Sequence, residues 1–302
     1  MTYLLPPYLK LGDKIALIST ARKISEQEIE PAINIIKNWG FEPVKGKNLH
    51  EIHHQFAGTV RQRMTDLQWA LNDPEIKAII CARGGYGTVQ LIDGIDFEAF
   101  IKNPKWICGY SDVSVLHAHV QQNFGIASLH SSMPLNFPKT GLDNEASLTL
   151  KKALLGETLS YQSEAHVLNR KGNVKAEMVG GNLSILYSLT GTYSQLKTEG
   201  KILFLEDLDE YLYHIDRMMQ NLKRAGMLQN LAALVIGGMS DMKDNAVAFG
   251  KSAEEIIAEI VAEYDYPICF NFPAGHIENN FALKMGASVQ LEITEQGSTL
   301  MF

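Results

Sequence analysis

The first half of the chain alternates short apolar runs with longer amphipathic runs, and this alternation constrains the fold more than any other feature. Strand patterns occur at residues 14–20, 76–82 and 105–110. Helical patterns, with apolar residues at helical spacing, occupy 25–40 and 59–74. Strands that alternate with helices form a parallel sheet covered by helices on both faces. Ligands of such sheets bind at the carboxyl ends of the strands, so polar residues just after a strand are candidate site residues.

The second half of the chain returns to this alternation after a weaker segment. Residues 136–175 hold polar turns, one short helical pattern and a Lys/Asn/Gly run, which is typical of a connection between domains. A glycine turn that opens a helix is expected at 178–192, and strand patterns follow at 201–210 and 231–238. At 302 residues the chain is long enough for two domains.

Composition and the N-terminal segment exclude several classes of protein. The net charge of −7 disfavours nucleic acid as the main partner. No apolar stretch reaches the roughly 18 residues that a membrane span needs. The N-terminal residues lack a basic region and are interrupted by Pro6 and Pro7, unlike a signal peptide. We therefore expect a cytoplasmic protein that binds neither nucleic acid nor membrane.

The segment ICGYSDVS (107–114) places Ser111 between a strand pattern and a helical pattern. A serine at such a turn can be a nucleophile, provided that a histidine and a carboxylate activate it. It can equally be the N-cap of the following helix. The esterase elbow G-x-S-x-G would need a glycine where Val113 stands, which argues against an ordinary esterase or lipase. The local pattern leaves both interpretations of the serine open.

A glycine cluster, ARGGYG (82–87), follows another strand pattern and leads into a predicted helix at 87–95. Adjacent glycines at a strand end can direct backbone N–H groups at an anion or at a developing oxyanion. Phosphate binding is a competing interpretation, but neither G-x-x-x-x-G-K-[ST] nor G-x-G-x-x-G is present. A simple tight turn is the third interpretation.

A carboxylate and a histidine later in the chain complete a candidate catalytic set. Glu206 directly ends the apolar strand pattern of LFLEDLDE, which suits a carboxylate held in a fixed, partly buried position. The acids that follow it, Asp207, Asp209 and Glu210, match no standard calcium loop. His276 lies in the loop FPAGHIENN, and loops on a rigid scaffold often carry catalytic bases. With the serine above, the order along the chain is Ser…Glu…His.

Two histidine pairs are candidates for metal ligands, His53–His54 and His117–His119. Residues two apart on a helix do not share a face, so the second pair is poorly placed to hold one ion. No H-E-x-x-H or cysteine-rich zinc pattern accompanies either pair. We expect neither a metal nor another cofactor.

Taken together, these segments resemble the LD-carboxypeptidases (murein tetrapeptide carboxypeptidases) and the related microcin-immunity peptidases. The resemblance extends over nearly the whole chain, and several matching segments are long. They are FAGTVRQRMTDLQWALNDPEIKAIICARGGYG, PKWICGYSDVSVLH, GGNLSILYSLTGT, ILFLEDLDEYLYHIDRMM and PAGHIENNFALKMGASVQL.

The resemblance implies a fold and a catalytic triad. The fold is an α/β protein whose N-terminal domain, residues 1–160, has a parallel sheet in three layers (flavodoxin- or amidotransferase-like) and carries the nucleophile. A smaller C-terminal α/β domain with a mixed sheet, residues 161–302, carries the other two triad residues. The implied enzyme is a metal-independent serine peptidase. Ser111 would be its nucleophile, His276 its general base and Glu206 the carboxylate that orients the base.

The resemblance also implies a reaction and its supporting groups. The family removes a terminal D-alanine from cytoplasmic murein tetrapeptide during peptidoglycan recycling. The backbone N–H groups of Gly85 and Asp112 would form the oxyanion hole. A terminal carboxylate must also be recognised, and Arg83 and Arg217 are the candidates. The resemblance suggests a homodimer, with a small peptide as substrate.

Two alternatives and two departures from the family pattern remain at the level of sequence. The protein could be an immunity-type peptidase that cleaves a peptidyl-nucleotide antibiotic, which would need an aromatic side chain stacked on the purine. It could also be a muropeptide-binding protein without turnover. The family often has HGPM where this chain has His130-Ser131-Ser132-Met133, and often threonine at Ser114. These departures leave the triad intact but can change the shape of the substrate pocket.

Overall fold

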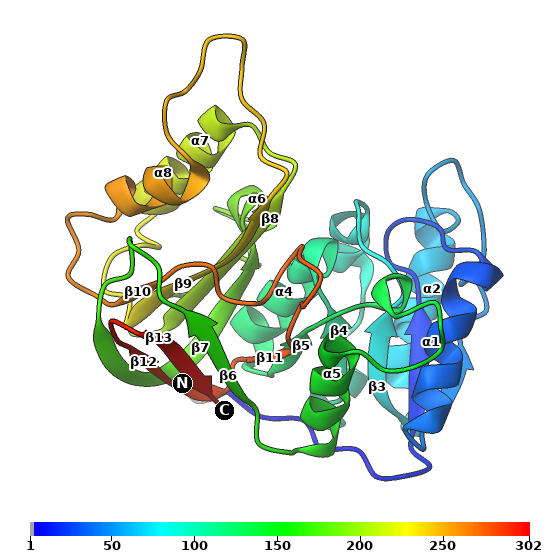
Figure 1. The fold of residues 1–302 in the computed structure, drawn as a ribbon. Coiled ribbons are helices and arrows are strands. Elements are labelled where there is room, and N and C mark those ends of the chain that lie inside the picture. The colour runs from blue at the N-terminus through cyan, green and yellow to red at the C-terminus, as the bar shows by residue number, and fades with distance from the viewer. Residues whose placement is uncertain (1–2) are drawn as a thin grey trace.

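The structure, a computed structural model, describes residues 3–302, which form two α/β domains side by side (Figure 1). Each domain is built on one β-sheet with helices packed against it. Within the described range, no helix combines the length and the apolar character needed to span a bilayer. The predicted two-domain α/β fold is confirmed.

The first sheet has six strands in the order β11-β5-β4-β3-β1-β2. The first five strands along the chain pair in parallel. They are β1 (Lys14–Ile18), β2 (Glu42–Lys45), β3 (Ile76–Cys81), β4 (Trp106–Gly109) and β5 (Ser128–His130). The helices that connect and follow them are α1 (Glu26–Asn38), α2 (Val60–Asn72), α3 (Glu98–Lys102), α4 (Ser114–Phe124) and α5 (Glu145–Leu155).

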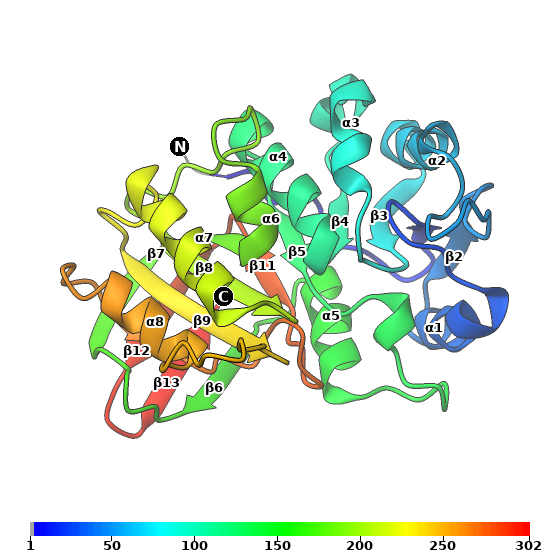
Figure 2. The ribbon, with the colours of Figure 1, turned by 90° about the horizontal axis from the view of Figure 1, so that it is seen from above.

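Both faces of the first sheet are buried by helices. Ile15 and Leu17 of β1 belong to the core that includes α1 and α5, whereas Ala16 and Ile18 belong to the core that includes α2 and α4. Figure 2 shows α2, α3 and α4 on one side of the strands, with α1 and α5 on the other. A strand buried on both faces has a continuous apolar sequence, which is why its pattern is unbroken. The predicted three-layer arrangement is confirmed.

The second sheet is mixed and has seven strands in the order β10-β9-β8-β7-β12-β13-β6. Strands β7 to β10 pair in parallel, and β12, β13 and β6 extend the sheet with antiparallel pairs. The strands are β6 (Ser160–Glu164), β7 (Gly172–Asn182), β8 (Ile202–Leu208), β9 (Ala233–Ser240), β10 (Ile268–Cys269), β12 (Ser288–Ile293) and β13 (Gly297–Met301). The helices of this domain are α6 (Leu183–Ser188), α7 (Leu212–Arg224) and α8 (Ala253–Ile260).

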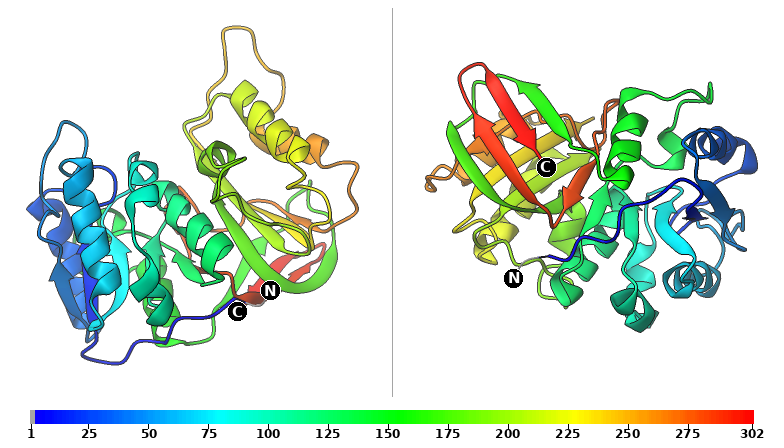
Figure 3. Two further views of the ribbon diagram at one scale, coloured as in Figure 1. Left: turned by 180° about the vertical axis from the view of Figure 1, so that it is seen from behind. Right: turned by 90° about the horizontal axis from the view of Figure 1, so that it is seen from below.

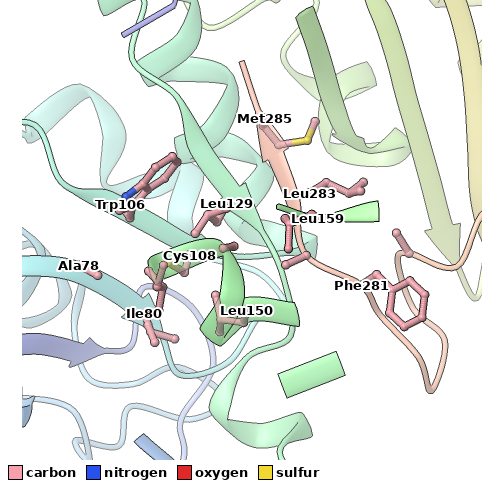
Figure 4. Packing of buried hydrophobic residues seen from close by; sticks show 14 of the residues in the cluster. Ala78, Ile80, Trp106, Cys108, Leu129, Leu150, Leu159, Phe281, Leu283 and Met285 are labelled. Carbon is pink, nitrogen blue, oxygen red and sulfur yellow. The ribbon is translucent and has the colours of Figure 1, made fainter. Parts of the chain in front are cut away.

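The two domains share a core and a strand. Strand β11 (Leu283–Met285) comes from the C-terminal part of the chain, but it pairs antiparallel with β5 at the edge of the first sheet. Figure 4 shows Leu283 and Met285 of this strand near Leu129 of β5, with Leu159 and Phe281 nearby. These residues lie in one buried cluster that also includes residues of the second sheet. The position of the two sheets relative to each other is therefore set by apolar packing.

A second link between the domains lies at the carboxyl end of β7, the long bent strand seen in Figure 3. The Asn182 backbone N–H donates to the Ser114 hydroxyl at the start of α4, at 3.0 Å. Gly180 and Gly181 both have positive φ, and a Cβ on Gly181 would lie 2.5 Å from Ser114 Oγ. The glycines therefore allow the strand to approach the first domain closely.

Three local predictions differ from the structure. The helix expected at 87–95 is wrong: the segment forms two short 3₁₀ turns, at Thr88–Gln90 and Ile92–Gly94. The expected glycine turn at 178–192 is instead the end of strand β7, and α6 begins only after it. The weak segment contains α5 and also strand β6, which pairs with β13 far along the chain. Such long-range pairing leaves no local periodic signal.

Candidate active site

Ser111 lies at a sharp turn between strand β4 and helix α4. Its φ is +61°, in the left-handed region that residues other than glycine rarely adopt. Gly109, two residues earlier, has φ +150°, and a Cβ there would lie 2.8 Å from Val113 Cγ2. Backbone strain of this kind costs about 1–3 kcal/mol and persists only where the surrounding structure imposes it. The turn is a single 3₁₀ segment, Ser111–Val113, and it holds the serine just after the carboxyl end of β4.

The glycine cluster after β3 packs directly against this turn. A Cβ on Gly84 would lie 2.9 Å from Ser111 Cβ and 3.1 Å from Ser111 Oγ. Gly85 has φ +112°. The buried carboxylate of Asp112 accepts a hydrogen bond from the Thr88 backbone N–H at 2.8 Å. This bond joins the serine turn to the glycine segment, a role of the Asp112 side chain that the sequence did not reveal.

Glu206 and His276 form a hydrogen-bonded pair in the second domain. Glu206 follows Phe204 on the face of β8 that is directed at the first domain, and it is fully buried. The His276 ring donates from Nδ1 to Glu206 Oε2 at 2.6 Å, and the His276 backbone N–H donates to the same oxygen at 3.1 Å. A Cβ on Gly275 would lie 2.7 Å from Glu206 Cβ, so glycine is needed for this approach. With Nδ1 engaged, Nε2 is the ring nitrogen left for chemistry.

The carboxylate of Glu206 and the imidazole of His276 change each other's pKa values. Burial alone would lower the pKa of His276, but the Glu206 charge and hydrogen bond outweigh burial and raise it. Burial alone would raise the pKa of Glu206, but the neighbouring histidines lower it to about 2. The carboxylate therefore stays ionised at neutral pH and holds the ring in one tautomer.

A second histidine lies at the other oxygen of the same carboxylate. His130 ends strand β5 in the first domain, is fully buried, and has Nε2 4.0 Å from Glu206 Oε1. Its ring packs against Tyr110 and Phe204. Among residues 3–302, neither His130 nitrogen nor Glu206 Oε1 has a hydrogen-bond partner. The carboxylate thus lies between one histidine from each domain. The motif HSSM contains the only sequence signal for this residue.

Asp207 is a second buried acid beside Glu206. It accepts hydrogen bonds from the Asn182 side chain at 2.9 Å and from the Ser184 backbone N–H at 2.8 Å. Burial and the neighbouring Glu206 charge raise the pKa of Asp207 to about 7. Asp207 is therefore protonated more easily than an ordinary aspartate, and its hydrogen bonds fix the end of β7 beside the site.

Residues from both domains line one cavity of about 440 Å³. Ser111 and His276 both face it, whereas Glu206 and Asp112 lie behind it and act on its lining. Part of the lining comes from the first domain: Arg22, Arg83, Gly84, Gly85, Tyr110, Ser111, Met133, Leu135 and Asn136. The second domain supplies Asn182, Ser184, Ile185, Asp207, Leu208, Asp209, Glu210 and His276.

The two arginines expected to bind a carboxylate differ in position. Arg83 lines the cavity, but its guanidinium donates to the Lys23 carbonyl at 3.2 Å and lies 3.9 Å from Glu28. Arg217 is not in the lining, and its guanidinium stacks over the Tyr213 ring at 5.2 Å. The structure adds Arg22 to the lining, a residue that the sequence pattern did not single out.

The histidines considered as metal ligands have other contacts. His117 is buried, and its Nε2 is 2.9 Å from the Gly109 carbonyl oxygen. His119 Nδ1 contacts the Ser194 hydroxyl at 2.9 Å. His53 and His54 stack edge to face. In the described part of the chain, no three His, Cys, Asp or Glu side chains are grouped as metal ligands.

Comparison with known proteins agrees with this architecture. Residues 15–131 match the LD-carboxypeptidase N-terminal domain, and residues 175–291 match the LD-carboxypeptidase C-terminal domain. The chain is similar in fold to a muramoyltetrapeptide carboxypeptidase from Oxalobacter formigenes, with TM-score 0.87, 25% identity, and coverage of 95% of this chain and 98% of the other. The microcin C7 self-immunity protein MccF gives TM-score 0.86 over 99% of this chain and 98% of the other; at 20% identity, this similarity shows the fold alone.

Curated relatives resemble the chain over almost its full length. A probable murein peptide carboxypeptidase of Bacillus subtilis is 33% identical over 300 residues, covering 98% of this chain and 93% of the relative. The murein tetrapeptide carboxypeptidase of Pseudomonas aeruginosa is 31% identical over 291 residues, covering 93% of this chain and 94% of the relative. The resemblance expected from the sequence is confirmed: the chain belongs to the LD-carboxypeptidase family of serine carboxypeptidases.

Proposed function

We propose that this protein is a serine LD-carboxypeptidase that removes the terminal D-alanine from murein tetrapeptide. One observation carries the proposal: Ser111, on a strained turn, and His276, held by Glu206, line the same cavity. A serine, a histidine and a buried carboxylate are the parts of an acyl-transfer triad.

In the first step, Ser111 attacks the carbonyl of the residue that precedes D-alanine. His276 Nε2 takes the hydroxyl proton as the bond forms. Glu206 keeps the Nδ1 proton in place and stabilises the imidazolium that results. Because Glu206 is fully buried and its pKa is lowered, it remains a carboxylate throughout.

The tetrahedral intermediate carries a negative oxygen that needs hydrogen-bond donors. We assign this role to the backbone N–H groups of Gly85 and Asp112. Two features support the assignment: the glycine segment packs on Ser111, and the bond from Thr88 to the Asp112 carboxylate fixes the two segments relative to each other. One such donor typically contributes on the order of 10²–10³ in rate.

The remaining steps use the same groups. His276 returns its proton to the amine of D-alanine, which leaves, and Ser111 stays acylated by the shortened peptide. Water then attacks this ester with His276 again acting as base, which frees the serine. These residues supply nucleophile, base and oxyanion donors, so the proposed reaction requires no metal and no cofactor.

An activity on peptidyl-nucleotides ranks second. It would need an aromatic side chain free to stack on the base. Tyr110 is the one Tyr, Phe or Trp in the cavity lining, but its ring packs 4.6 Å from His276 and its hydroxyl donates to Asn136 at 3.2 Å. Because these contacts hold the ring within the protein, it is not free to stack on a nucleotide base, which favours a peptide substrate.

Mass spectrometry of defined peptides tests the proposed function. A murein tetrapeptide that ends in D-alanine should lose that residue, whereas the diastereomer that ends in L-alanine should stay intact. Excess chelator should not change the rate. Cleavage of a peptidyl-nucleotide with none of the tetrapeptide would promote the second activity. Tight tetrapeptide binding in calorimetry without product would instead indicate a binding protein.

Two further properties belong to this proposal. The substrate is a cytoplasmic recycling intermediate, so we propose that the protein acts in the cytoplasm. We also propose a homodimer, which light scattering at several protein concentrations checks. A mass equal to one chain at all concentrations would exclude the dimer.

A further inference from the structure

A carboxypeptidase must recognise a free carboxylate very close to the bond it cuts. In its substrate, three covalent bonds separate the scissile carbonyl carbon from the terminal carboxylate carbon, a span of about one residue, or roughly 3.5 Å. The group that binds this carboxylate must therefore border the oxyanion hole. This inference rests on the proposed function and names a specificity residue for the same site.

Arg22 meets this requirement by its position on the glycine segment. A Cβ on Gly85 would lie 2.6 Å from Arg22 Cδ and 2.8 Å from Arg22 Nε, so the arginine side chain crosses the face of Gly85. The adjacent Gly84 packs against Ser111 in the same way. Consecutive Cα atoms are 3.8 Å apart, so Arg22 and Ser111 flank one glycine pair.

The guanidinium of Arg22 is also unpaired within the described part of the chain. Its side chain is exposed, lines the cavity, and makes no salt bridge or side-chain hydrogen bond with any residue from 3 to 302. Its backbone N–H donates to the Gly84 carbonyl at 3.4 Å, which ties the arginine to the same segment. An unpaired guanidinium can offer two parallel N–H donors to a carboxylate.

The other arginines fit this role less well. Arg83 also lines the cavity, but its guanidinium already donates to the Lys23 carbonyl and lies 3.9 Å from Glu28. Arg217 lies outside the lining. The second domain contributes Asp207, Asp209 and Glu210 to the lining, and carboxylates there repel a substrate carboxylate.

We propose that Arg22 binds the terminal carboxylate of the substrate and thereby makes the enzyme act at the end of a peptide. It positions the last residue so that the preceding carbonyl faces Ser111 and the Gly85 N–H. The strand-end rule also covers Arg22, which follows the strand pattern at 14–20, but no motif in the sequence distinguished it from the other polar residues there.

A pair of substrates isolates this contact. The tetrapeptide and its C-terminal amide are compared with wild type, Arg22→Gln and Lys23→Gln, a matched loss of the neighbouring charge outside the cavity lining. The wild type and Lys23→Gln should prefer the acid over the amide by roughly 10- to 100-fold in kcat/KM, as expected for charged hydrogen bonds. Arg22→Gln should lose most of this preference, and Arg22→Lys should recover part of it.

Other outcomes would overturn the assignment. If Arg22→Gln keeps the full preference for the acid, or if Arg83→Gln abolishes it instead, Arg22 does not bind the carboxylate. Failure of the proposed function itself is distinguishable, because then wild type cleaves neither peptide. In that case, calorimetry with Ser111→Ala and Ser111→Ala/Arg22→Gln still compares acid with amide, and an equal preference in both proteins overturns the proposal.

Discussion

The two domains contribute to the cavity in different ways. The first domain supplies backbone geometry: Ser111 has a positive φ, and Gly84 leaves room for it where any Cβ would intrude. The second domain supplies buried charge: Glu206 is fully buried and Asp207 is 1% exposed. His276 is hydrogen-bonded to Glu206. The nucleophile is thus placed by chain conformation, whereas the base is placed by electrostatics. The two contributions should respond differently to mutation and to pH.

Within the electrostatic contribution of the second domain, we expect substitution of Glu206 to reduce activity most. In Glu206→Gln the neutral amide cannot stabilise an imidazolium or fix the Nδ1 proton, and we expect kcat to fall on the order of 10⁴. Steady-state kinetics on the tetrapeptide measures this loss. Asp207→Asn is the matched control, since Asp207 makes no hydrogen bond to His276, and its loss should be far smaller. Equal losses in the two variants would contradict the pairing described for Glu206.

Within the backbone geometry that the first domain contributes, we expect activity to be most sensitive to substitution of Gly84. In Gly84→Ala the new methyl group crowds Ser111 Cβ and Oγ, so the serine must shift. A displacement at the reacting atom typically costs about 10² in rate, and we expect a fall of that size in kcat/KM. Gly141→Ala, where no atom lies within 4 Å of the new Cβ, is the control for a glycine-to-alanine change away from the serine; φ is +72° there, so the change strains the backbone of its own turn. Its kcat/KM should equal that of wild type. Unchanged kinetics in Gly84→Ala would show that the close contact is not needed.

The pH dependence of kcat distinguishes the electrostatic contribution of the second domain from the backbone geometry of the first. The base must be neutral to accept a proton, and the pKa of His276 is raised by Glu206 above its ordinary value of about 6.5. Activity should therefore rise with pH through a midpoint above this value, falling about tenfold per pH unit on the acid side. Gly84→Ala should keep this midpoint, because it leaves the charges intact.

The same pH profile discriminates between His276 and Asp207 as the group that titrates. The pKa of Asp207 is raised to about 7, so its titration falls in a similar range. In Asp207→Asn the acid limb should persist, since it belongs to His276. Disappearance of the limb in this variant would assign it to Asp207 instead.

His130 belongs to the first domain but lies beside Glu206 of the second. Of the proposed replacements, that of His130 should have the smallest effect on kcat. It lies 4.0 Å from the Glu206 oxygen that His276 does not use. In His130→Gln the carboxylate loses a positioning neighbour but keeps its bond to His276, and we expect kcat to fall about tenfold or less with KM unchanged. The midpoint of the pH profile should also move to a lower value if Glu206 becomes freer to rotate. An altered KM with unchanged kcat would place His130 in substrate binding.

Sequence reasoning succeeded where local pattern and strand-end chemistry coincide. Ser111 follows β4, the glycine pair follows β3 and Glu206 lies near the end of β8, so the rule that ligands bind at carboxyl ends of parallel strands brings all three to one site. The serine and the glycines line the cavity, and Glu206 holds His276 from behind it. The strands themselves were predictable because burial on both faces gives continuous apolar runs.

Sequence reasoning failed where contacts depend on segments far apart in the chain. The bond between Thr88 and Asp112, the pairing of β11 with β5 and the approach of His130 to Glu206 are all tertiary. The segment at 87–95 forms two short 3₁₀ turns in place of a helix, and the carboxylate that binds its first N–H comes from another strand end, a contact that the local sequence does not show. Arg217 shows the converse error: its helix is predicted well, but its side chain stacks on Tyr213 outside the cavity lining.

The central claim is that Ser111 of the first domain and the Glu206–His276 pair of the second domain perform one reaction. Release of D-alanine from the tetrapeptide by Ser111→Ala, measured in excess chelator beside wild type and Ser188→Ala, tests it most directly. Ser188 is an exposed serine on α6, so its variant should retain the wild-type rate. We expect the rate with Ser111→Ala to fall by on the order of 10⁶. D-alanine release at the wild-type rate by Ser111→Ala would contradict the account.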